Sequence, residues 1–162
     1  MTDKIKISHT HDNDLTHSMV HYLLAIHKLK ETKGYARVTD IANYLGLTKG
    51  SVSIALINLK KRKLIIEDES KFFTLSEEGH EEVHNILSNR TLLYYFLRDF
   101  LKVDDETAEK DSCLMEHLMS EQSRIKLFEF IQGLDRQSSL NWKGFKSLDD
   151  FMKAQKGDKH LE

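Results

Sequence analysis

The chain has 162 residues, of which 40% are hydrophobic and 31% are charged, and its formal net charge is −2. This length and composition predict a globular protein of one domain or two small ones. No stretch approaches the roughly 18 consecutive apolar residues of a membrane span, and the polar N-terminus lacks the apolar core of a signal peptide, so we expect a cytoplasmic protein without a membrane partner. The single cysteine excludes an intramolecular disulfide and leaves a free thiol or a metal ligand.

The charge is unevenly distributed along the chain. Residues 1–76 contain 12 Lys and Arg against 8 Asp and Glu, or +4, whereas residues 77–162 contain 12 against 18, or −6. A polyanion such as nucleic acid would therefore bind the first segment. A net positive charge of this size also occurs on an ordinary solvated helix face. It indicates nucleic-acid binding only where a binding motif is present as well.

The first half of the chain predicts three helices. From residue 13 to residue 33, apolar side chains recur every three or four positions, which is typical of an amphipathic helix. Thr39 can cap a short helix over residues 40–45, and after the turn at Gly46, Thr48 can cap a third helix. Two short helices joined by a tight glycine-containing turn predict a helix-turn-helix.

A hairpin follows the third helix. The runs LIIE and KFFTL are rich in β-prone residues and flank the polar turn DES. Three helices and a hairpin predict a winged helix-turn-helix domain, which we assign to residues 1–76. Helical periodicity then continues through residues 77–134, where Ser76, Asp104 and Ser120 are placed to cap successive helices. Residues 135–162 have weak periodicity and predict a loosely ordered C-terminal tail with one helical turn near residues 148–153.

The third helix carries small polar and basic residues on the side opposite its apolar stripe. Such groups contact base edges and phosphates when a helix enters the major groove of DNA. We therefore expect double-stranded DNA as the ligand, although some winged helices bind only proteins. The candidate DNA-binding residues are Thr48, Lys49, Ser51, Ser53, Lys60 and, in the wing, Lys71. Lys49 and Ser51, near the helix N-terminus, are the best candidates for base or phosphate contact.

A second candidate site lies in CLMEH. On a helix, Cys113, Glu116 and His117 fall within an arc of about 100°. Thiolate and imidazole suit borderline transition metals, and the carboxylate shifts the preference toward iron or manganese. A buried cysteine beside a solvated helix edge produces the same pattern, so a further ligand from elsewhere in the chain is required to decide.

The sequence resembles the diphtheria toxin repressor and manganese transport regulator family of metal-dependent repressors, in its short two-domain form. The resemblance covers about residues 18–134 and rests on GYARVTDIANYLGLTKGSVSIALINLKKRKLI, on FTLSEEG and on FLRDFLKVDDETAEKDSCLMEHLMS. It implies a mainly α fold in which the winged helix-turn-helix and its small β-hairpin wing precede an α-helical metal-binding and dimerisation domain. It also implies a homodimer that binds operator DNA and represses metal-uptake genes when Fe(II) or Mn(II) is bound.

The resemblance implies a ligand set as well. Cys113, Glu116 and His117 would be completed by His21 of the first helix, where relatives carry methionine or aspartate. Fe(II) is favoured over Mn(II), because Mn(II) prefers harder oxygen ligands than the thiolate of Cys113. The other helical histidines default to solvated faces, and of these only His17, one turn before His21, is placed to reach the metal.

Two further metal positions of the family are absent from this chain. Manganese-type members carry a second carboxylate where this sequence has Leu24, which cannot coordinate a metal. The ancillary site of iron-type members corresponds here to Arg90, Tyr94 and Glu109. We therefore expect one metal per subunit. Arg90 either replaces the lost metal as a fixed cation paired with Glu109 or forms an ordinary surface pair with it.

Two other functions remain open. One is a winged-helix regulator with a degenerate metal site, either metal-independent or redox-responsive through Cys113. The other is an enzyme that uses Cys113 and His117. Two residues four apart on one helix provide no oxyanion donors, and no third residue is placed to orient them, so we predict that the chain is not an enzyme.

Overall fold

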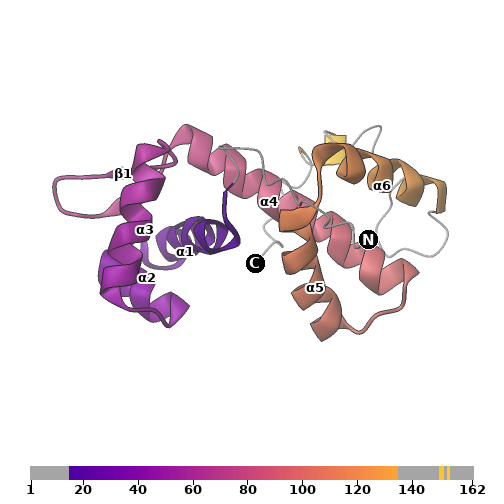
Figure 1. The fold of residues 1–162 in the computed structure, drawn as a ribbon, viewed down its shortest axis with the longest axis horizontal. Helices are drawn as coiled ribbons and strands as arrows, with labels where there is room; N and C mark the ends of the chain where they lie inside the picture. The colour runs from indigo at the N-terminus through magenta and orange to yellow at the C-terminus, as the bar shows by residue number, and fades with distance from the viewer. Residues whose placement is uncertain (1–14, 135–149, 152, 154–162) are drawn as a thin grey trace, which may run out of the picture.

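The computed structural model describes residues 15–134, 150, 151 and 153. In order along the chain, its elements are α1 (His17–Lys33), α2 (Val38–Leu45), α3 (Lys49–Lys61), β1 (Ile65–Glu67), β2 (Phe73–Leu75), α4 (Glu77–Tyr95), the π-helical turn η1 (Phe96–Phe100), α5 (Asp105–Leu118) and α6 (Glu121–Leu134). Figure 1 shows α1, α2, α3 and the hairpin at one end, and α4 running from them to α5 and α6 at the other. The predicted winged helix-turn-helix followed by a helical domain is confirmed. Within the described residues, no helix is long and apolar enough to span a membrane.

Four helices begin at the predicted caps. In each case a side-chain oxygen accepts a hydrogen bond from the backbone N–H three residues later, which satisfies one of the unpaired donors of the first turn. The caps are Thr48 (3.2 Å to Ser51 N), Ser76 (3.0 Å to Gly79 N), Asp104 (3.0 Å to Thr107 N) and Ser120 (3.3 Å to Ser123 N).

The predicted cap at Thr39 is wrong. Helix α2 starts at Val38, so Thr39 lies inside its first turn, and the N-cap residue Arg37 makes no side-chain capping bond. The segment before α2 is tied to the wing, because the Ala36 carbonyl accepts a hydrogen bond from Phe73 N–H at 2.8 Å. This long-range bond keeps the chain extended as far as Arg37, and the helix begins directly afterwards.

One hydrophobic core holds α3 in place. It includes buried side chains from α1, α2, α3 and both strands, among them Leu23, Ile26, Ile41, Val52, Leu56, Leu59, Ile65 and Phe73. The strands pair antiparallel, with Ile65 opposite Leu75 and Glu67 opposite Phe73. Because α3 buries only Val52, Leu56 and Leu59, its other side remains accessible.

The winged helix joins α4 through a close backbone contact. Ser76 Oγ donates to the Lys63 carbonyl at 2.6 Å, and Ser76 N–H donates to the Leu64 carbonyl at 3.0 Å. A Cβ atom added to Gly79 would lie 2.0 Å from that same Leu64 oxygen. The first turn of α4 therefore packs closely against the backbone that follows α3.

A second, smaller core lies at the far end of α4. It contains the buried side chains of Leu92, Phe128, Ile131 and Phe151. Of the predicted C-terminal tail, only Asp150, Phe151 and Lys153 are described; they are helical, and the rest of the tail lies outside the described residues. The Phe151 ring is fully buried, and its centroid lies 5.7 Å from that of Phe128 on α6.

Candidate functional site

The candidate DNA-binding residues of α3 lie on its accessible side, but they differ in how far their polar atoms are engaged. Thr48, Lys49, Ser51 and Lys60 are exposed, and Ser53 is half-buried. The hydroxyls of Thr48 and Ser51 are 2.9 Å apart, and the Ser53 hydroxyl donates to the Lys49 carbonyl at 2.8 Å. The Lys49 ammonium makes no ion pair within the described part of the chain. Among the candidate side chains of α3 it is therefore the most available for binding a phosphate or a base.

Two apolar residues on the same side of α3 were missed by the sequence analysis. Ile54 is 65% exposed and Ile57 is 51% exposed, although both are in the middle of a helix that packs on a core. The helical spacing could have identified them, because they fall outside the buried stripe of Val52, Leu56 and Leu59. In a major groove, exposed aliphatic groups contact the methyl group of thymine.

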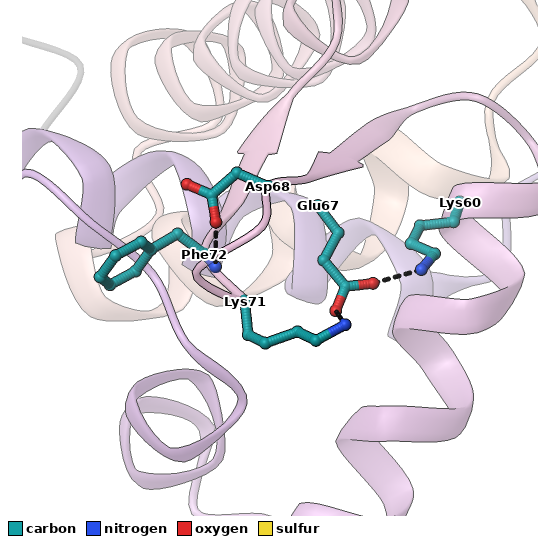
Figure 2. Close-up of polar contacts among 5 residues, drawn as sticks. All are labelled: Lys60, Glu67, Asp68, Lys71 and Phe72. Carbon is teal, nitrogen blue, oxygen red and sulfur yellow. Dashed lines mark hydrogen bonds and ion pairs between the residues drawn. The ribbon is translucent and has the colours of Figure 1, made fainter.

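The other two predicted DNA contacts, Lys60 and Lys71, share one carboxylate. Figure 2 shows the two ammonium groups reaching Glu67 of β1 from α3 and from the wing turn. Lys60 Nζ forms an ion pair with Glu67 Oε2, and Lys71 Nζ lies 3.3 Å from Glu67 Oε1. Hydrogen bonds from Lys60 and then from Lys71 lower the pKa of Glu67. The wing is thereby tethered to the end of α3, and the two positive charges are partly neutralised.

The first-helix candidate His21 lies beside two other histidines. Its Nε2 atom is 3.0 Å from Nε2 of His17, and the His17 ring centroid is 5.6 Å from that of His117 on α5. Burial, followed by the positive fields of His17, Arg90 and His117, lowers the pKa of His21. The structure therefore brings predicted ligands from the DNA-binding half and the helical half into one region.

The second α5 candidate, Glu116, is a buried carboxylate. It is only 7% exposed, and no hydrogen bond or ion pair to it occurs among the described residues. Burial raises the pKa of Glu116 to about 7; nearby Arg124 opposes this effect, Glu82 adds to it, and Arg90 opposes it. Since an unpaired buried carboxylate is costly, a cation bound at this position would stabilise its charged form.

Cys113 completes the α5 group as a half-buried free thiol. Within the described residues, no three His, Cys, Asp or Glu side chains are close enough together to hold an ion as they stand. The donors nevertheless fit a divalent transition metal in their chemistry: two imidazoles, a carboxylate and a thiol from α1 and α5. The positive charge of Arg90 also acts to lower the pKa of both His21 and Glu116.

The three positions expected to lack a second metal hold polar contacts instead. Arg90 Nη2 lies 3.3 Å from Glu109 Oε1, which is the predicted pair and links α4 to α5. The Tyr94 hydroxyl donates to Asp105 Oδ1 at 3.0 Å and accepts from Arg98 Nη1 at 3.2 Å. An ion pair from Arg90 and a hydrogen bond from Tyr94 thus join α4 to α5 at these positions.

Both halves of the chain match models of known protein families. The family model described as "Iron dependent repressor, N-terminal DNA binding domain" matches residues 14–71, and "Iron dependent repressor, metal binding and dimerisation domain" matches residues 76–141. The chain is 32% identical over 124 residues to the HTH-type transcriptional regulator MntR of Bacillus velezensis, covering 76% of this chain and 87% of the relative. It is 31% identical over 133 residues to MntR of Bacillus subtilis, covering 82% and 92% respectively.

Solved structures share the fold. A hypothetical protein from Sulfolobus solfataricus superposes with a TM-score of 0.64 at 21% identity, over 74% of this chain and 91% of that chain. IdeR of T. acidophilum superposes with a TM-score of 0.59 at 24% identity, over 73% of this chain and 55% of that chain, so the match spans about half of the IdeR chain. With both family models and the MntR relatives in agreement, the chain belongs to the diphtheria toxin repressor and manganese transport regulator family of metal-dependent, DNA-binding transcriptional repressors, and it is not an enzyme.

Proposed function

We propose that this protein represses metal-uptake genes in the cytoplasm, with Fe(II), or alternatively Mn(II), as co-repressor and one metal per subunit. The observation that carries the proposal is the meeting of histidines from the two halves: His21 Nε2 lies 3.0 Å from His17 Nε2 on α1, and the His17 ring centroid lies 5.6 Å from that of His117 on α5. Cys113 favours Fe(II), whereas the relatives named MntR support Mn(II) as the alternative. The comparisons give no support to a metal-independent or redox-responsive regulator.

The proposed ligands are His21, Cys113, Glu116 and His117. When bound, the metal would supply positive charge beside the buried carboxylate of Glu116. It would also link helix α1 to helix α5. Because His21 belongs to α1 and the other three ligands belong to α5, the four side chains together link the winged helix to the helical domain. This link would set the orientation of α3, which the core shared by α1 and α3 holds rigidly relative to α1.

The proposed partner of α3 is double-stranded operator DNA. Lys49, Lys60 and Lys71 would neutralise phosphates, while Thr48, Ser51 and Ser53 lie nearby on the same surface. We assign Ile54 and Ile57 to contacts with thymine methyl groups, since they are the exposed aliphatic residues of that helix. A preference for A·T pairs within the half-site follows from this assignment.

We further propose that the protein acts as a homodimer formed by its helical domain. Leu118 on α5 is 81% exposed, and Leu114, Phe130 and Leu134 are also exposed nearby in sequence on α5 and α6. Since contiguous exposed apolar side chains mark interaction surfaces, we assign these four residues to one dimer surface. A two-fold axis through that surface would present two α3 helices to a palindromic operator with half-sites about one helical turn, or a multiple, apart.

The proposed function is tested by an anaerobic DNA-binding titration of purified protein with Fe(II), Mn(II) or Mg(II). We expect Fe(II) and Mn(II), but not Mg(II), to raise operator affinity, because imidazole and thiolate ligands discriminate against Mg(II). Cys113→Ser is expected to reduce the response to Fe(II) more than the response to Mn(II). Equal operator affinity with and without metal would contradict metal-dependent repression by this chain.

Lys49→Ala is expected to weaken DNA binding more than Lys60→Ala. The Lys60 ammonium is already paired with Glu67, whereas no ion pair to Lys49 is found in the described part of the chain, so Lys49 should carry more of the phosphate contact. Loss of one full phosphate contact reduces the slope of log affinity against log salt by about 0.9. Fluorescence anisotropy with an operator fragment at several salt concentrations measures both changes. Identical slopes for wild type and Lys49→Ala would remove Lys49 from the interface.

A further inference from the structure

His17 lies in the metal region, yet it belongs neither to the ligand set proposed above nor to the family positions that correspond to it. It is the first residue of α1 and precedes His21 by one helical turn. It contacts both of the proposed imidazole ligands, His21 on its own helix and His117 on α5. We propose that His17 is a further ligand of the metal, so that three imidazoles surround it; this inference rests on the function proposed above.

The first support is the distance between the ring nitrogens of His17 and His21. Their Nε2 atoms are 3.0 Å apart. Two imidazole nitrogens that bind one metal at about 2.0–2.1 Å, with an angle between them of about 90–109°, lie about 2.8–3.4 Å apart. The two nitrogens thus already have the separation of neighbouring ligands. In the observed contact one ring nitrogen donates a hydrogen bond to the other. A bound metal ion would take the place of the shared hydrogen.

The second support is the spacing along α1. Residues i and i+4 of a helix face the same side, and two histidines at this spacing are a well-known way for one helix to supply two ligands to one transition metal. Thr16 caps the helix directly before His17, accepting a hydrogen bond from Met19 N–H at 3.4 Å. The cap fixes the start of the helix, and with it the side of α1 on which His17 lies.

The third support is the position of His17 between the two halves of the protein. Its ring meets the His117 ring at a centroid distance of 5.6 Å and an angle of 61°. The α1 helix therefore offers two donors, His17 and His21, on the side that faces His117 of α5.

A third imidazole changes which ions the site would select. Nitrogen-rich sites favour Fe(II), Co(II) and Zn(II), whereas Mn(II) is held best by oxygen ligands. The added ligand should therefore raise the affinity for Co(II), used here as a spectroscopic probe for borderline divalent metals, much more than the affinity for Mn(II).

The experiment compares wild type with His17→Ala, His17→Gln and His27→Ala in Co(II) and Mn(II) titrations. His17→Gln keeps a side chain that can hydrogen-bond to His21, so it separates loss of a ligand from loss of that bond. His27→Ala is the matched control: it is also a half-buried histidine of α1, but its ring pairs with Glu31 at 3.4 Å and lies near His80. Metal-free melting temperatures establish that each variant is folded.

We expect both His17 variants to lose Co(II) affinity by at least about tenfold, because even a residue that only orients a ligand contributes about 10–100-fold. The visible absorption of bound Co(II) should change as well, Mn(II) affinity should change much less, and His27→Ala should match wild type. Wild-type Co(II) affinity and spectrum in either His17 variant, or an equal loss in His27→Ala, would overturn the assignment of His17 and leave the four-ligand site standing. If wild type binds neither Co(II), Fe(II) nor Mn(II), the proposed function fails with it.

Discussion

His21→Ala is expected to reduce metal-stimulated DNA binding strongly while leaving metal-free DNA binding unchanged. His21 is the proposed ligand contributed by α1, and Cys113, Glu116 and His117 all belong to α5. The three α5 residues can still hold a metal in the variant, but α1 then keeps only one of its two proposed donors, His17, so the metal is tied less firmly to the winged helix. The variant should therefore separate metal binding from the response of α3 to the metal.

The size of this effect follows from the coupling between two binding sites. Allosteric coupling is typically about 1–3 kcal/mol, which corresponds to about 5–150-fold in operator affinity. The same factor must appear in reverse, so operator DNA should tighten metal binding by the wild type much more than by His21→Ala. Anaerobic anisotropy titrations at fixed and varied Fe(II) or Mn(II) measure both directions, with His27→Ala as the control on the same helix. Full metal stimulation in His21→Ala would mean that the link between the halves does not involve this residue.

Gly79→Ala is expected to destabilise the protein strongly. The added Cβ would lie 2.0 Å from the carbonyl oxygen of Leu64, which is backbone and cannot rotate away as a side chain would. Overpacking of this kind costs about 1–3 kcal/mol and occasionally more. In a protein of this size each 1 kcal/mol shifts the melting temperature by about 2–4 °C. Thermal unfolding followed by circular dichroism measures the change.

Gly133→Ala provides the matched control for Gly79. Among the described residues, a Cβ added to Gly133 in α6 meets no atom within 4 Å, and alanine in a helix is favoured over glycine by about 1 kcal/mol. This control should therefore leave the melting temperature unchanged or raise it. Because Gly79 lies in the first turn of α4, a shift of that turn should also reorient the winged helix relative to α5, and metal-stimulated DNA binding should fall in parallel. An unchanged melting temperature in Gly79→Ala would show that the junction is looser than the contact with Leu64 implies.

The helices, their caps and their buried faces were predictable from the sequence because they depend on local physics. Thr48, Ser76 and Asp104 each accept a hydrogen bond from a backbone N–H only three residues away. The hairpin was predictable for the same reason, since its strands are separated by a short polar turn. The start of α2 was predicted wrongly, because the bond from Phe73 N–H to the Ala36 carbonyl joins residues far apart in sequence.

The candidate site, like the fold, has features that depend on local sequence and features that depend on long-range contacts. Its residue types and helical spacings are present in the sequence, which was enough to predict DNA on α3 and, together with the family resemblance, a metal on α5. Only the tertiary structure decided that Glu67 pairs with both Lys60 and Lys71, that Glu116 is buried, and that His17 lies between His21 and His117. Spacing along a helix determines which side chains share a face, but packing between helices determines what that face meets, and this packing depends on the side chains of the whole chain at once.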